Sequence, residues 1–200
     1  MRLLFIRHGD PDYEHDCLTE KGIREAQYLA ERMMKEAMDE IYVSPLGRAQ
    51  ETASYTLKAT GRTAETKEWL KEFDPQIHRP DCKEHLSGCW DWHPEDWMQY
   101  DEFFDCNRWG DNPILAEGKV KERYGWVCDH FDELLASKGY RRHNHYYKVN
   151  RESHETLVFF CHFGVECVIL SHLTGLPFMP FIHGFACNPT GVTELFTEER

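Results

Sequence analysis

The chain has 200 residues, of which 41% are hydrophobic and 29% charged. This composition is typical of a globular protein with one domain, or with one domain and a sizeable insertion. Its formal net charge of −12 disfavours nucleic acid or an anionic membrane as the main partner, and it makes any cluster of Arg and His side chains informative.

The first predicted element is a short buried strand at residues 3–6, where four apolar residues stand in a row. It ends in Arg7, His8 and Gly9. In an open α/β sheet, ligands bind just beyond the carboxyl ends of the strands. This strand therefore brings a cation and a titratable imidazole to the edge where such a fold binds its ligand.

A second predicted strand, at residues 41–43, ends in Ser44. Before it, a polar loop at residues 10–16 leads to a helix with Thr19 as a suitable N-cap. After it, a helix is predicted over residues 46–58, with Arg48 in its opening turn. Free backbone N–H groups and the helix dipole attract anions there, and a guanidinium matches phosphate or carboxylate.

A third strand is predicted at residues 63–66, after which the chain leaves the simple alternation of strand and helix. The next stretch, at about residues 73–155, holds five of the six tryptophans and a predicted helix at roughly residues 116–138. We expect the rest of this stretch to form an inserted helical cap over the carboxyl edge. The predicted fold is a single α/β domain over residues 1–200, with three α/β/α layers around a mainly parallel sheet.

The clearest buried strand, at residues 156–161, ends in His162, Phe163 and Gly164. The longest apolar run, near residues 158–170, is interrupted by His162, Gly164 and Glu166, so the sequence predicts no membrane-spanning segment. Two closing strands are predicted at residues 185–187 and 192–196, separated by a turn.

In a mainly parallel sheet these strand ends meet at one edge. Arg7 and Arg48 would then lie beside His8 and His162. Cationic side chains this close together repel one another unless an anion binds between them, and a tetrahedral phosphate could bind in this way. A metal is the alternative, since histidines at strand ends can bind one, but the two arginines and the lack of a carboxylate at these strand ends disfavour it.

The chain resembles the histidine phosphatase superfamily, the phosphoglycerate mutase-like group. The resemblance rests on residues 3–9, 18–22, 44–53 and 161–164, which occur in the family's order, and it leaves residues 73–155 unmatched. It implies a metal-independent phosphatase without a cofactor, which hydrolyses a small phosphomonoester through a phosphohistidine on His8 and releases inorganic phosphate.

The resemblance also implies roles for the other residues. Arg7, Arg48 and His162 would bind the phosphate and stabilise its charge in the transition state, and Gly9 and Phe163 belong to the same phosphate-binding group.

A carboxylic acid must also protonate the leaving oxygen and then activate water. Glu72 matches the family's acid, with Glu68 and Glu65 as alternatives.

Departures from the family pattern favour hydrolysis. Asp10, Pro11 and Glu14 fill the region where the family has other phosphate-loop residues, and Phe163 replaces the first Gly of the usual His-Gly-Gly. A mutase-type phosphotransferase needs to bind two phosphates and is the first alternative. A phosphate-binding module without turnover is the second, and a metallohydrolase is the third.

Two local patterns have weaker interpretations. Zinc sites use the residue types found at Cys82, His85, Cys89 and His93, but the spacing matches no standard finger and ordinary packing is preferred. Residues 141–148 are basic and aromatic. A solvated loop is the preferred interpretation there, followed by a patch that steers anionic substrates and then by nucleic-acid binding.

The eight cysteines are scattered and mostly lie in apolar contexts. The chain passes from Met1 directly into a strand, which is not the pattern of a secretory signal. We therefore expect a cytoplasmic protein with reduced thiols. The sequence leaves the oligomeric state open.

Overall fold

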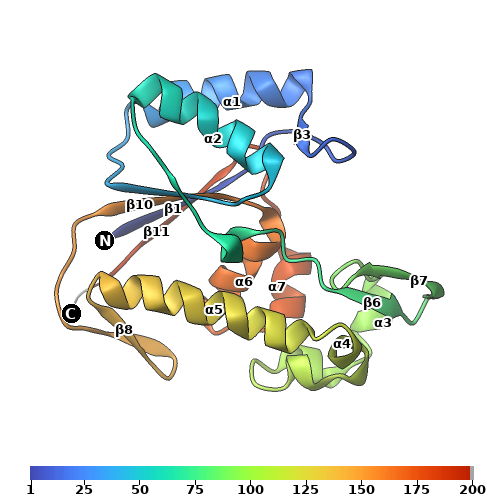
Figure 1. Ribbon diagram of the computed structural model, residues 1–200. Helices are drawn as coiled ribbons and strands as arrows, with labels where there is room; N and C mark the ends of the chain where they lie inside the picture. The colour runs from blue at the N-terminus through green and yellow to red at the C-terminus, as the bar shows by residue number, and fades with distance from the viewer. Residues whose placement is uncertain (199–200) are drawn as a thin grey trace.

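A five-stranded sheet lies at the centre of the computed structural model, which describes residues 1–198 (Figure 1). The strand order is β11-β1-β10-β4-β5, in which β1, β10, β4 and β5 run parallel and β11 is antiparallel to β1. The predicted fold class, α/β with a mainly parallel sheet, is confirmed. The strands are β1 (Arg2–Arg7), β4 (Glu40–Val43), β5 (Glu65–Thr66), β10 (Thr156–Cys161) and β11 (Val192–Phe196).

Helices cover both faces of this sheet (Figure 1). Alternation along β1 explains why, because successive side chains of a strand point to opposite faces. Leu4 and Ile6 pack in one buried cluster, whereas Leu3 and Phe5 belong to another. The first face carries α1 (Glu20–Met33) and α2 (Gly47–Thr60), and the second carries α5 (Val120–Ser137), α6 (Phe163–Thr174) and α7 (Phe178–Gly184).

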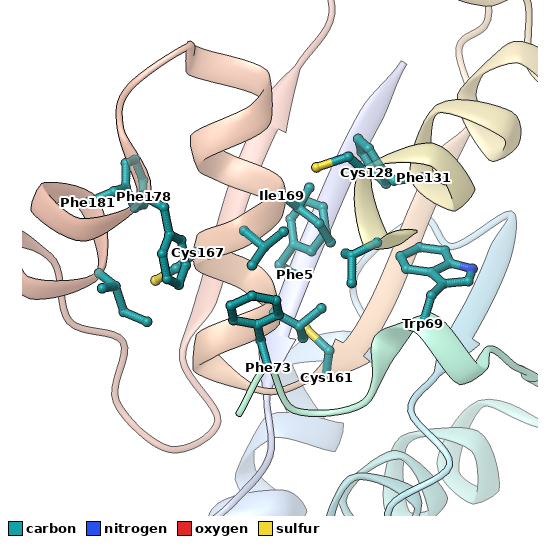
Figure 2. Packing of buried hydrophobic residues seen from close by; sticks show 14 of the residues in the cluster. Phe5, Trp69, Phe73, Cys128, Phe131, Cys161, Cys167, Ile169, Phe178 and Phe181 are labelled. Carbon is teal, nitrogen blue, oxygen red and sulfur yellow. The ribbon is translucent and has the colours of Figure 1, made fainter. Parts of the chain in front are cut away.

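Aromatic side chains fill the space between the sheet and the second helical face (Figure 2). The rings of Phe5 and Phe159 stack with centroids 4.8 Å apart, and Phe131 of α5 lies 6.2 Å from each of them. Trp69 closes the group at 6.2 Å from Phe131. Burial of one such ring contributes on the order of 1.5–3 kcal/mol, so this core fixes the strand ends that carry the site.

The N-terminus of α1 forms as the sequence predicts. Thr19 is the N-cap, and its hydroxyl oxygen accepts a hydrogen bond from the backbone N–H of Gly22 at 3.1 Å. The preceding loop is held by two short paired strands, β2 (Pro11–Asp12) and β3 (Cys17–Leu18).

The segment at residues 73–155 has three parts. The first lies beyond the carboxyl end of the sheet (Figure 1) and contains β6 (Gln76–Arg79), β7 (Cys82–Gly88), α3 (Pro94–Trp97) and α4 (Pro113–Glu117), with 3₁₀ turns at Asp101–Phe104 and Trp109–Asp111. The second part is α5, which packs on the sheet. The third is the hairpin of β8 (Tyr140–His143) and β9 (Tyr146–Val149).

Three local predictions differ from the structure. The helix predicted at residues 116–138 is divided, because Lys119 has a left-handed backbone with φ 52° between α4 and α5. Residues 185–187 are not a strand; they follow α7, and the carbonyl of Cys187 accepts from the Arg7 side chain instead of a sheet partner. Residues 141–148 form a hairpin, held by Arg142 donating to the carbonyls of Asn144 and His172.

Candidate active site

His8 lies at the carboxyl end of β1 and is only 1% exposed. Its Nδ1 is 2.7 Å from the carbonyl oxygen of Gly9, which can only accept, so Nδ1 carries the proton and Nε2 keeps a lone pair. Burial lowers the pKa of His8 to about 4, and the neighbouring Arg48 and Arg7 add to this lowering. The imidazole is therefore neutral at pH 7, and Nε2 has a lone pair with which it can act as a nucleophile.

Arg48 faces this nitrogen from the first turn of α2. Its Nε donates to His8 Nε2 at 3.3 Å, and its Nη1 forms an ion pair with Asp16 at 2.6 Å. The other carboxylate oxygen of Asp16 accepts from the backbone N–H of Gly47 at 2.6 Å. A Cβ at Gly47 would lie 2.2 Å from the Asp16 carbonyl oxygen, so only glycine permits this approach. The loop thus fixes the guanidinium beside His8.

His162 follows β10 and is fully buried, with its ring centroid 5.0 Å from that of His8. Its Nε2 is 2.7 Å from the hydroxyl of Ser44, which follows β4. Within residues 1–198, its buried Nδ1 has no hydrogen-bond partner. Burial lowers the pKa of His162 to about 2, and Arg48 and His8 contribute. A neutral imidazole with one unsatisfied nitrogen suits an incoming polar group.

Arg7 completes the group of strand-end residues. Its Nη1 donates to the carbonyl oxygen of Cys187 at 2.5 Å, while its buried Nε is unpartnered in the described part of the chain. The ring of Phe163 lies 5.8 Å from the guanidinium carbon. The Phe that departs from the family pattern therefore supports Arg7 by a cation–π contact.

Glu72 reaches the site from the segment after the 3₁₀ turn Glu68–Leu70. Its Oε1 accepts from the backbone N–H of Phe73 at 2.8 Å and of Val165, in the first turn of α6, at 3.3 Å. A Cβ at Gly164 would lie 2.6 Å from this oxygen, so a larger residue there would displace the carboxyl. Burial raises the pKa of Glu72 to about 7, against the opposing effect of these hydrogen bonds and of Arg48. Such a carboxyl can give or take a proton near neutrality.

Arg48 and Glu72 line a cavity of about 980 Å³, and Arg48 in turn donates to His8. This volume is at the upper end of the range usual for small-molecule sites. The other lining residues are Tyr13, Leu46, Lys71, Asp74, Pro75, Trp90, Gly118, Lys119, Glu122 and Arg123.

The two alternative acids do not reach this cavity. Glu65 forms an ion pair with Lys67 at 2.7 Å and Glu68 with Lys71 at 2.8 Å, and each carboxylate side chain is 65% exposed. Gly9 uses both of its backbone groups inside the protein, because its N–H donates to the Thr52 hydroxyl at 3.0 Å and its carbonyl accepts from His8. Its role here is to hold the nucleophile.

Sequence reasoning missed two acidic residues. Asp16 lies in a polar loop without periodicity, and nothing in its neighbours marks it. Glu166 is 2% exposed within α6, accepts from the Thr193 hydroxyl, and has a pKa raised to about 7 by burial. Its isolated carboxyl among the apolar residues at 163–170 was the available signal.

Within residues 1–198, no group of three or more His, Cys, Asp or Glu side chains is placed to hold a metal ion, and Cys82, His85, Cys89 and His93 form no such group. None of the helices formed by these residues combines the length and the apolar character needed to cross a membrane.

These features define the class of the protein: a mainly parallel α/β sheet with two arginines and two histidines gathered at its carboxyl edge. The chain belongs to the histidine phosphatase superfamily (branch 1), whose family model matches residues 3–200. A comparison with curated protein sequences gives no match.

Solved structures share this fold at low sequence identity. A phosphoserine phosphatase of Entamoeba histolytica, in complex with 3-phosphoglyceric acid, is 22% identical with a TM-score of 0.62, over 96% of this chain and 89% of that chain. A mycobacterial glucosyl-3-phosphoglycerate phosphatase, in complex with inorganic phosphate, is 20% identical with a TM-score of 0.61, over 98% and 89%. These likenesses establish the fold.

Proposed function

We propose that this protein is a phosphomonoesterase that transfers the phosphoryl group of a small phosphorylated substrate first to His8 and then to water. The observation that carries this proposal is the tautomer of His8. The Gly9 carbonyl holds its Nδ1 proton, so Nε2 presents a lone pair on the side of Arg48. The superfamily and the phosphate and phosphoester ligands of the two related phosphatases support the same substrate class.

In the first proposed step, His8 Nε2 attacks phosphorus and the bond from phosphorus to the leaving oxygen breaks. Glu72 gives its proton to that oxygen, which leaves as an alcohol. The developing charge on the phosphoryl oxygens meets Arg48 and the unpartnered Arg7 Nε and His162 Nδ1. Arg48 Nε exchanges its hydrogen bond with His8 for one with the phosphate.

In the second step, the ionised Glu72 takes a proton from a water molecule, and the resulting oxygen attacks the phosphorus of the phosphohistidine. The bond between phosphorus and Nε2 breaks, inorganic phosphate forms, and His8 and Glu72 regain their starting states. A carboxyl with a pKa of about 7 can serve as acid and then as base in one cycle.

Hydrolysis of p-nitrophenyl phosphate in the presence and absence of a chelator tests this function. We expect turnover that the chelator leaves unchanged, because every group in the proposed steps belongs to the chain. Loss of turnover on chelation would assign the reaction to a metallohydrolase. Absence of turnover with bound phosphate retained would favour a binding module or a mutase specific for another substrate.

Asp16→Asn is expected to lower kcat/KM by roughly tenfold, because the charge-assisted hydrogen bond that holds Arg48 weakens. Asn keeps an oxygen that can accept from the Gly47 N–H, so the loop should stay folded. KM should rise more than kcat falls. Asp12→Asn, in the same loop but paired with His15, is the matched control, and equal kinetics for the two variants would refute this role.

A further inference from the structure

The wall of the cavity carries charges that the proposed reaction does not use. Beyond Arg48 and Glu72, it contains the cations of Lys71, Lys119 and Arg123 and the carboxylates of Asp74 and Glu122. With Arg48 included, four cationic side chains face three carboxyls, in a chain whose net charge is −12. Burial favours the protonated form of Glu72, so the cationic side chains outnumber the ionised carboxyls that line the cavity. Arg48 has its own counterion in Asp16.

Two of these cations are not neutralised by the protein. Lys71 is paired with Glu68 at 2.8 Å, but neither Lys119 nor Arg123 forms an ion pair within residues 1–198. Asp74 and Glu68 are the carboxylates whose charges act on Arg123, and neither is within ion-pair distance. Arg123 is partly buried and Lys119 is exposed. A partly buried cation such as Arg123 without a counterion is costly, so a ligand anion would relieve it.

Arg123 is also held in place. Its guanidinium carbon lies 4.0 Å from the ring centroid of Trp126, one turn further along α5. Stacking on the indole fixes the plane of the guanidinium, while none of its N–H groups has a protein partner within residues 1–198. An arginine fixed in this way loses little freedom when it binds a carboxylate or phosphate with two N–H groups.

Lys119 occupies a strained position at the same wall. Its φ of 52° lies in the left-handed region, which lysine adopts at an energetic cost. The preceding Gly118 fixes this turn, because a Cβ there would lie 2.6 Å from the carbonyl oxygen of Gln76. Strained residues of this kind concentrate at binding sites, and here the strain brings a lysine to the cavity wall.

We propose that Lys119 and Arg123 form a second anion-binding subsite, so that the substrate is a phosphomonoester whose leaving group carries a second anionic group. This inference rests on the proposed function, since it takes the phosphoryl group to lie at His8. The cavity of about 980 Å³ is lined by Arg48 and Glu72 as well as by Lys119 and Arg123, so it has room for a leaving group that reaches from the phosphoryl group to these two cations. The second group is a carboxylate or a phosphate, because a guanidinium and an ammonium bind both.

Two substrate pairs distinguish these anions. The first pair is 3-phosphoglycerate and glycerol phosphate, which differ by one carboxylate. The second is fructose 1,6-bisphosphate and fructose 6-phosphate, which differ by one phosphate. We expect the wild-type protein to prefer the more anionic member of at least one pair. The pair that shows the larger preference in kcat/KM identifies the second group.

Arg123→Ala and Lys119→Gly should each reduce that preference by about tenfold, the usual value of one charge-assisted contact. Glycine suits the left-handed backbone, so the second variant removes the amine without adding strain. Arg123→Lys should restore part of the preference. Lys121→Ala, on the same helix but paired with Asp111, is the matched control and should keep the wild-type ratio.

A wild-type protein that hydrolyses both members of each pair equally, or a double variant that keeps the preference, would overturn the subsite and leave the proposed function intact. If no ester is turned over, the proposed function fails and calorimetric titration decides the subsite separately. Tighter binding of 3-phosphoglycerate than of glycerol phosphate, lost in Arg123→Ala, would support the subsite. Equal binding of the two would contradict it.

Discussion

His8→Ala is expected to reduce turnover of any phosphomonoester by on the order of 10⁵-fold or more, because it removes the covalent route itself and not one contact among several. Arg48 would lose the acceptor at 3.3 Å but keep its ion pair with Asp16, so the phosphate-binding group should persist. The measurement is kcat/KM for p-nitrophenyl phosphate, together with the affinity for inorganic phosphate, which should change far less.

A phosphoenzyme measurement makes this prediction specific to the nucleophile. A labelled substrate should leave acid-labile, base-stable phosphate on the wild-type chain and none on His8→Ala or on the larger His8→Asn. His15→Ala is the control, because His15 is exposed in the adjacent loop and its ring pairs with Asp12. Label retained on either His8 variant would assign the nucleophile to another residue.

The strand ends were predictable because two simple signals coincide there. Apolar runs identify β1 and β10, and parallel strands place the residues that follow them at one edge, which brings Arg7, His8 and His162 together. Glu72 is different. Its residue type and place were suggested by the family resemblance, whereas its contact with the start of α6 depends on Gly164 and on the path of a loop, which periodicity does not describe.

Asp16 and the cavity wall illustrate what pattern analysis cannot supply. Asp16 pairs with Arg48 from 32 positions away, through a loop in which no spacing rule operates. The wall of the cavity joins the segment after the 3₁₀ turn Glu68–Leu70 with the break between α4 and α5. That break exists because Gly118 packs against the Gln76 carbonyl, a tertiary contact that overrides the helical preference of residues 116–138.

The basic run at residues 141–148 shows how a composition signal can mislead. Its hairpin follows the C-terminal end of α5, whereas the residues that line the cavity stand at the opposite end of this 18-residue helix (Figure 1). A helix of this length spans about 27 Å, well beyond the screening distance of roughly 8 Å at physiological ionic strength. Steering of a substrate by this run is therefore a poor explanation of its charge.

Glu72→Gln is expected to lower kcat for an alkyl phosphate by about a hundred- to ten-thousandfold, the usual contribution of a general acid and base. The wild-type kcat/KM should rise as the pH rises through about 4, where His8 loses its proton, and fall as the pH rises through about 7, where Glu72 loses its own. The fall above pH 7 should be absent in Glu72→Gln once ionisation of the substrate is accounted for. Gly164→Ala should also alter this fall above pH 7, because the added methyl group displaces the Glu72 carboxyl.

Pre-steady-state kinetics separate the two roles of Glu72. The nitrophenolate group leaves without needing a proton, so Glu72→Gln should release about one equivalent of it in a burst and then stall, since no base activates water for the phosphohistidine. An alkyl phosphate should give no burst in the same variant. Glu68→Gln, which alters an exposed ion pair, should behave as wild type. Steady turnover of the alkyl ester by Glu72→Gln at the wild-type rate would remove Glu72 from the mechanism, and Glu166, whose pKa burial also raises to about 7, would be the next carboxyl to test.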